Sequence, residues 1–143
     1  MTWSFPEPIG NQHVTEVPLS EVVLITRHLE TRELHTYLSN VALRDLSDPN
    51  TPPPQAADAS GRSAQTFMVE VICTKDGSTR RACARGRDIY AFTAPLVCEA
   101  VERILDGATA QSSGAQSPGA VFDSHAFLHA LTPEHLEIEV RSD

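Results

Sequence analysis

The sequence of 143 residues lacks most of the signals that mark a cofactor, a metal or a membrane segment. Its seven glycines form neither a GxGxxG fingerprint nor a phosphate loop, so the chain alone should not hold NAD(P). Its three cysteines have no CxxC spacing, and we interpret them as buried, reduced thiols. No apolar run is long enough to span a membrane, and the first residues lack the features of a secretory signal. We therefore expect a cytoplasmic protein.

Positive charge is scarce, and this scarcity restricts the partners. Eleven basic residues stand against nineteen acidic ones, which gives a net charge of −8. Such a surface repels phosphate backbones and anionic lipid, so we expect no nucleic-acid partner and no membrane partner. The basic residues nevertheless gather between Lys75 and Arg87, where Asp76 is the one acid, and a local anion site remains open.

Two alternating strand patterns surround Asp76-Gly77, a pair that favours a tight hairpin turn. A two-residue loop would place an apolar face toward the core. The residues expected on that face are Phe67, Val69, Val71, Cys73, Ala82 and Ala84, with Val71 opposite Ala82 and Val69 opposite Ala84.

The opposite face of this hairpin carries arginines. Arg81, Arg85 and Arg87 share it, and guanidinium groups bind carboxylates through two parallel hydrogen bonds. We predict these three residues as substrate-binding. A solvated or subunit-facing sheet surface is the alternative.

A long amphipathic helix is predicted over residues 89–106. Asp88 and Thr93 can both cap its start, and Pro95 favours Thr93 because proline is tolerated in a first turn. Gly107 follows the last apolar residue, as expected at a helix end. The apolar stripe needs a partner surface. We predict partner docking by Leu96, Val97, Val101 and Ile104.

Shorter elements complete the expected α+β fold, which has a mixed or antiparallel sheet, the central hairpin, the long helix and two shorter helices. We expect a short helix at 21–29 capped by Ser20, with a strand as the alternative because of its β-branched residues. We also expect a strand at 33–42, a helix capped by Asp123, and a last strand at 135–140. The expected organisation is an α+β domain at 1–107 with a flexible loop at 44–62, a flexible linker at 108–120, and a helix-strand segment at 121–143.

His125 and His129 stand four residues apart, a spacing that lets two imidazoles share a metal. No HExxH glutamate accompanies them. We therefore interpret them as exposed histidines and predict no metal site.

Several stretches together are similar to the C-terminal half of saccharopine dehydrogenase-like proteins, from about Trp3 to Val140. They are TWSFPEPIG, VPLSEVVLITRHL, SAQTFMVEV, RGRDIYAFTAPLVCEAVERILDG and SPGAVFDSHAFLHALTPEHLEIEV. The resemblance implies a substrate-binding and dimerisation domain, with residues 89–106 as the helix that packs against an N-terminal Rossmann domain. That Rossmann portion is absent from this sequence, so we do not expect an independent NAD(P)-dependent dehydrogenase.

Three hypotheses follow. The chain is the substrate-binding and dimerisation part of a split oxidoreductase, whose NAD(P) is bound by a separate Rossmann-domain subunit. Alternatively, it is a non-catalytic binding or dimerisation module that forms a homo-oligomer. Thirdly, it is a cofactor-free isomerase or cyclase in a biosynthetic pathway. A small-molecule carboxylate is a possible ligand in each case, and whether the chain is an enzyme stays open.

Overall fold

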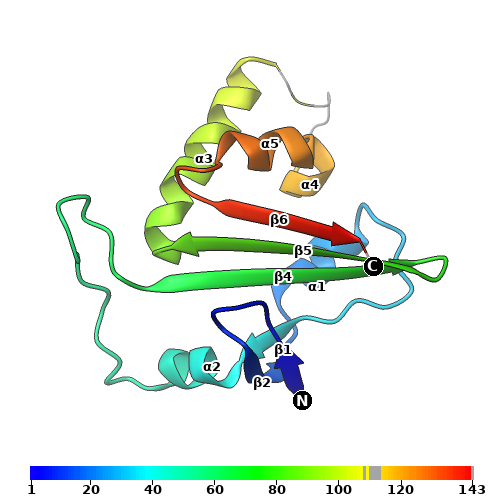
Figure 1. Ribbon diagram of the computed structural model, residues 1–143. Helices are drawn as coiled ribbons and strands as arrows, with labels where there is room; N and C mark the ends of the chain where they lie inside the picture. The colour runs from blue at the N-terminus through cyan, green and yellow to red at the C-terminus, as the bar shows by residue number, and fades with distance from the viewer. Residues whose placement is uncertain (108, 110–113, 143) are drawn as a thin grey trace. The chain divides into compact units, whose positions relative to one another are not determined.

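The computed structural model of the protein describes residues 1–107, 109 and 114–142, and shows an α+β fold (Figure 1). Within these residues the strands form two three-stranded antiparallel sheets, accompanied by five helices. The chain divides into two compact units. Unit 1 comprises Met1–Pro53 and Ala115–Ala120, and unit 2 comprises Pro54–Gly114 and Val121–Asp143. The predicted fold class is confirmed, with four shorter helices in place of the two expected.

Unit 1 contains the first sheet, in the order β1-β2-β3. Its strands are β1 (Thr2–Ser4), β2 (Asn11–Glu16) and β3 (Tyr37–Ser39), and its helices include α1 (Ser20–Thr26) and α2 (Asn40–Ser47). The predicted strand at 33–42 is shorter than expected. The reason is local: the Ser39 hydroxyl accepts a hydrogen bond from the Ala42 N–H and caps α2, which ends the strand.

The expected Ser20 cap is wrong. Leu19 occupies the cap position of α1 without a side-chain hydrogen bond, and the Ser20 hydroxyl donates to the Glu21 carboxylate instead. The helix ends at Thr26 and is therefore shorter than the expected 21–29. The Thr26 hydroxyl donates to the carbonyl oxygen of Val22.

A later segment of the chain returns to unit 1. The Ser117 hydroxyl lies 3.2 Å from Nδ1 of His28, and α4 (Pro118–Val121) follows directly. The predicted linker at 108–120 therefore ends in a helix, while its residues 108 and 110–113 lie outside the described part of the chain.

Unit 2 is built on the second sheet, in the order β4-β5-β6. The strands are β4 (Thr66–Lys75), β5 (Ser78–Arg87) and β6 (Glu137–Ser142). The predicted hairpin register is confirmed, because Val71 pairs with Ala82 and Val69 pairs with Ala84. Asp76 and Gly77 both have positive φ, 50° and 80°, the conformation that a two-residue hairpin loop requires.

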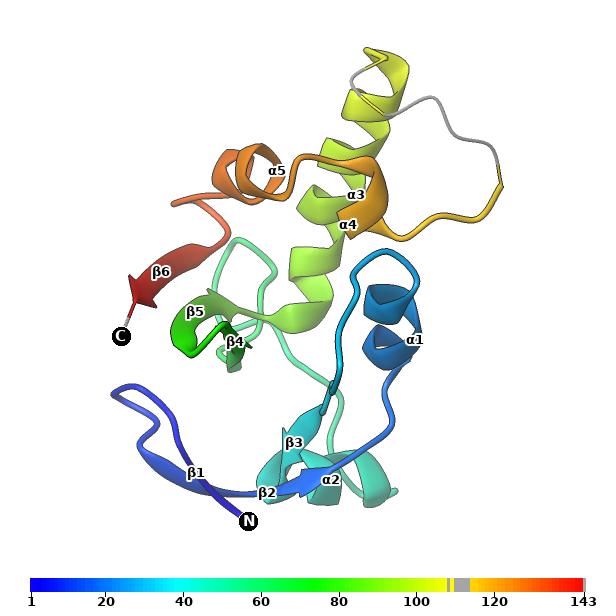
Figure 2. The same cartoon turned by 90° about the vertical axis from the view of Figure 1, so that its right-hand side faces the viewer.

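Two helices cover one face of this sheet (Figure 2): α3 (Ile89–Leu105) and α5 (Ser124–Ala130). Asp123 caps α5 as predicted, since its carboxylate accepts the Ala126 N–H at 2.7 Å. The rings of Phe122 and Phe127 stack with centroids 4.9 Å apart and bring the start of α5 onto the core. The buried centre consists of Phe127, Leu131 and Leu136, with Phe67, Ala84, Phe92, Leu96, Ala100, Phe122 and Ile138 packed against it.

The apolar hairpin face forms core at one end of the sheet only. Phe67 and Ala84 pack on the buried centre, but Val69 and Val71 are 50% and 56% exposed. The expectation that the whole face is core is therefore wrong, because α3 and α5 pack on the end of the sheet near Phe67 and leave Val69 and Val71 exposed. Val140, opposite Ala82 on β6, is exposed as well.

The cysteine prediction holds in part. All three thiols are free, but only Cys83 is buried, whereas Cys73 and Cys98 are exposed. None of the helices in the described part of the chain is both long and apolar enough to cross a membrane.

Candidate functional site

Asp88 caps the start of α3, so the preference for a cap at Thr93 is wrong. The Asp88 carboxylate accepts the Ala91 N–H at 3.0 Å and the Ser63 N–H at 2.6 Å. These hydrogen bonds, the one from Ser63 first, lower the pKa of Asp88 below its usual value. The cap therefore joins the start of α3 to the preceding loop, and Pro95 is accommodated inside the helix.

Helix α3 has two apolar faces with different surroundings. Its inner face, formed by Phe92, Leu96 and Ala100, packs against the core of unit 2. Its outer stripe consists of Tyr90, Val97, Val101 and Ile104, which recur at intervals of seven, four and three residues. Their exposed fractions are 63%, 48%, 47% and 55%, respectively. The helix thus presents a second apolar row to solvent.

The predicted docking residues therefore lie on two different faces of α3. Leu96 packs within unit 2, whereas Val97, Val101 and Ile104 all belong to the outer stripe. Tyr90 was not predicted, although its position seven residues before Val97 places it on the same face.

The three predicted substrate-binding arginines each lie near a carboxylate. An Nη atom of Arg81 is 3.7 Å from Glu70, and an Nη atom of Arg85 is 3.9 Å from Glu139. Glu139 also accepts hydrogen bonds from the guanidinium of Arg141 on its own strand. The sheet face that carries these arginines is therefore one of mixed charge.

Arg87 binds the loop that precedes β4. Its Nε donates to the carbonyl oxygen of Ser63 at 2.6 Å, and its Nη2 donates to that of Arg62 at 3.0 Å. Its Nη1 donates to Asp58 at 2.6 Å, and the Ser60 hydroxyl donates to the same carboxyl group. These contacts, the one from Ser60 first, lower the pKa of Asp58 to about 2. The loop at residues 58–63 is thereby attached to the end of β5.

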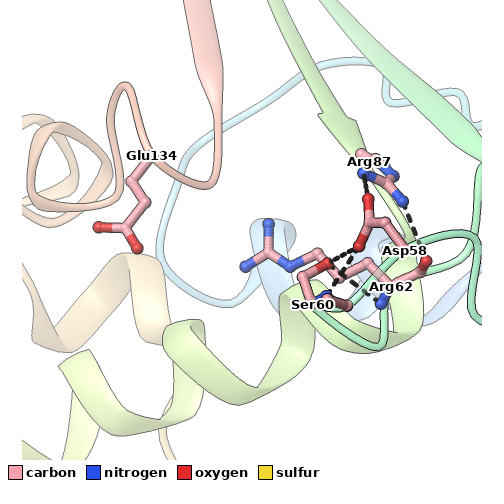
Figure 3. A pocket seen from close by; sticks show the side chains of 6 residues that line it. Asp58, Ser60, Arg62, Arg87 and Glu134 are labelled. Atoms are coloured by element: carbon pink, nitrogen blue, oxygen red, sulfur yellow. Dashed lines mark hydrogen bonds and ion pairs between the residues drawn. The ribbon is translucent and has the colours of Figure 1, made fainter.

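An open pocket of about 620 Å³ lies beside this loop in unit 2 (Figure 3). Its lining residues are Asp58, Ala59, Ser60, Arg62, Arg87 and Glu134. Nη2 of Arg62 lies 2.8 Å from Nδ1 of His135, a contact between residues 73 positions apart. Of the predicted site residues, the pocket contains only Arg87. No local pattern could have identified Arg62, because the contact that orients it is distant in sequence.

The histidine pair on α5 lies on its exposed side. The rings of His125 and His129 approach edge to face with centroids 5.6 Å apart. Nδ1 of His129 lies 3.0 Å from the Thr132 hydroxyl. Across the described residues, no group of three histidine, cysteine, aspartate or glutamate side chains is placed to hold a metal ion.

Comparisons with protein-family models, with curated proteins and with solved structures found no match to this chain.

Proposed function

We propose that this protein is the substrate-binding and dimerisation part of a split oxidoreductase of the saccharopine dehydrogenase-like type. In this proposal the outer stripe of α3 docks on a separate subunit that carries the Rossmann domain. The observation that carries the proposal is that Val97, Val101 and Ile104 are about half exposed on a helix whose opposite face is anchored.

Burial of the outer stripe by a partner would be energetically favourable. Complete burial of a valine or isoleucine side chain contributes about 1.5–3 kcal/mol. The stripe extends over a helix of 17 residues, which corresponds to a length of roughly 25 Å. Because the inner face already holds α3 in place, little conformational entropy is lost when a partner covers the outer stripe. Large contiguous apolar patches on a protein surface mark interaction sites.

The start of α3 is unsuitable for a dinucleotide. A pyrophosphate binds at a helix N-terminus through free backbone N–H groups and a glycine-rich turn. Here the Asp88 carboxylate accepts the Ala91 N–H, and it would also repel a phosphate. NAD(P) is therefore assigned to the partner subunit, and the role of this chain is to bind and orient the substrate.

A matched pair of valine substitutions tests the docking surface. Val101→Glu places a charge in the outer stripe, and Val71→Glu places the same charge on an exposed sheet position of the same unit. The measurement is co-purification from the native host, with the identity of each bound chain established by its sequence. We expect a stoichiometric partner with a GxGxxG fingerprint. Val101→Glu should bind this partner at least about tenfold more weakly, because a buried unpaired charge costs several kcal/mol. Val71→Glu should bind it with unchanged affinity.

Retention of that partner by Val101→Glu would refute the docking surface. A homo-oligomer that Val101→Glu dissociates, without any Rossmann-domain chain, would instead establish the alternative of a dimerisation module. Folding of both variants is checked by circular dichroism.

A further inference from the structure

The guanidinium of Arg62 has an unusual environment for a cation in an acidic protein. Its Nη2 contacts Nδ1 of His135, and no carboxylate of the described residues forms an ion pair with it. Arg87, in the same pocket, binds a carboxylate and two carbonyl oxygens. The guanidinium of Arg62 is therefore held in position by His135 and forms no ion pair among the described residues.

The contact with Arg62 determines the tautomer of His135. A guanidinium can only donate hydrogen bonds, so Nδ1 must accept and the ring proton must lie on Nε2. That Nε2 is 3.8 Å from Oε1 of Glu134. Nδ1 of His135 thus orients Arg62 through one N–H group, and the guanidinium forms no other hydrogen bond with the described residues.

The other charged groups of the pocket favour an anion with a single negative charge. The Asp58 carboxylate is bound by Arg87 and Ser60. The side chain of Glu134 is 84% exposed, and Figure 3 shows the guanidinium of Arg62 directed toward it and away from the Asp58 cluster. One available cation beside two carboxylates suits a singly charged anion and disfavours a dianion such as phosphate.

We propose that Arg62 binds the carboxylate of a small monocarboxylate compound in this pocket, and that His135 is the positioning residue that orients the guanidinium. Two-point hydrogen bonding between a guanidinium and a carboxylate supplies the affinity. The pocket volume of about 620 Å³ lies within the range of small-molecule sites, roughly 300–1,000 Å³. This inference does not rest on the proposed function.

The test uses the full chain and two probes, acetate and inorganic phosphate. Binding is followed by NMR at the Nε–H group of Arg62 and at the backbone N–H groups of residues 58–63. We expect saturable acetate binding that is weakened about tenfold or more by Arg62→Gln, because charged hydrogen bonds are lost. Arg62→Lys retains the charge without the two-point geometry and should bind with intermediate affinity.

Arg80→Gln is the matched control, since it removes the same charge from an exposed arginine of the same unit. It should leave acetate binding unchanged within about twofold. Phosphate should bind more weakly than acetate. An absence of saturable acetate binding by the unmodified protein, or equal binding by Arg62→Gln, would overturn the proposal.

The role of His135 is tested by rescue. His135→Leu removes the acceptor of the Arg62 N–H group and should weaken acetate binding about threefold to tenfold. His135→Asn places an amide oxygen near the position of Nδ1 and should restore most of the affinity. A purely structural role predicts that both variants behave alike, and that result would reject His135 as a positioning residue.

Discussion

The inner face and the outer stripe of α3 are both apolar, but they differ in how much of their surface is buried. Phe92, Leu96 and Ala100 on the inner face pack against the core of unit 2, whereas Val97 and Val101 of the outer stripe are about half exposed. Adjacent residues of similar hydrophobicity thus belong to different surfaces. An apolar helix face indicates a surface that packs against another element, but the fold of the chain decides which of two such faces is packed within the chain.

The same contrast occurs along the second sheet. Phe67 and Ala84 pack under α3 and α5, while Val69 and Val71 on the same face remain exposed. Unit 2 therefore has apolar surface on both a helix and a sheet. We assign docking to the helix because Val97, Val101 and Ile104 lie on one exposed face over about two turns.

The largest expected effect comes from two neighbouring positions on opposite faces of α3. Leu96→Ala should lower the free energy of unfolding by about 2 kcal/mol, because it removes core contacts. Val97→Ala should change it by less than about 0.5 kcal/mol, since the side chain is half exposed. Urea unfolding measures both. Equal losses would show that the outer stripe is core in solution.

The next effect concerns the start of the same helix. Asp88→Ala removes an acceptor for two backbone N–H groups, those of Ser63 and Ala91, whereas Asp123→Ala removes an acceptor for one. The urea midpoint should therefore fall further for Asp88→Ala than for Asp123→Ala. The reverse order would contradict the role of Asp88 in joining the loop to α3.

A smaller, local effect is expected in acid. The pKa of Asp58 is lowered from 3.8 to about 2 in the folded protein, so its stabilising contribution is complete above about pH 4. That contribution is lost as the pH falls from about 4 to about 2, because the carboxyl of the unfolded or locally opened chain takes up a proton at a higher pH than the carboxyl of the folded protein. The protection factor of the Ser60 N–H, which donates to the Asp58 carboxylate, should fall over this interval. In Asp58→Asn the protection factor of this N–H should already be low and should not change over this interval.

The smallest effect on stability is expected in the outer stripe itself. Val101→Glu should change the free energy of unfolding of the isolated protein by less than about 0.5 kcal/mol, since the side chain is 47% exposed. A large loss in urea unfolding would indicate that the stripe supports the fold of this chain.

The elements with strong local signals were predictable. Alternation around Asp76-Gly77 yielded the correct hairpin register, and the spacing of apolar residues identified the long helix with its end near Leu105. The cap at Asp123 also followed from local sequence. Turn chemistry, capping and periodicity act over a few residues, so these features are encoded in the nearby sequence.

The remaining features depend on contacts between distant residues. Asp88 caps α3, and Ser63, 25 positions away, donates a second hydrogen bond to its carboxylate. Arg87 was predicted as substrate-binding from its strand face, but its guanidinium is used by the loop at residues 58–63. The contact between Arg62 and His135 likewise requires the folded unit. The family resemblance and the docking of a Rossmann-domain subunit stay predictions.

The most direct test of the docking claim is a native mass determination of the protein purified from its own host, with every bound chain identified. We predict a stoichiometric complex with a chain that carries a dinucleotide-binding fingerprint, and dissociation of that complex by Val101→Glu. A monomer or a homo-oligomer that Val101→Glu leaves intact, without such a chain, would contradict the claim.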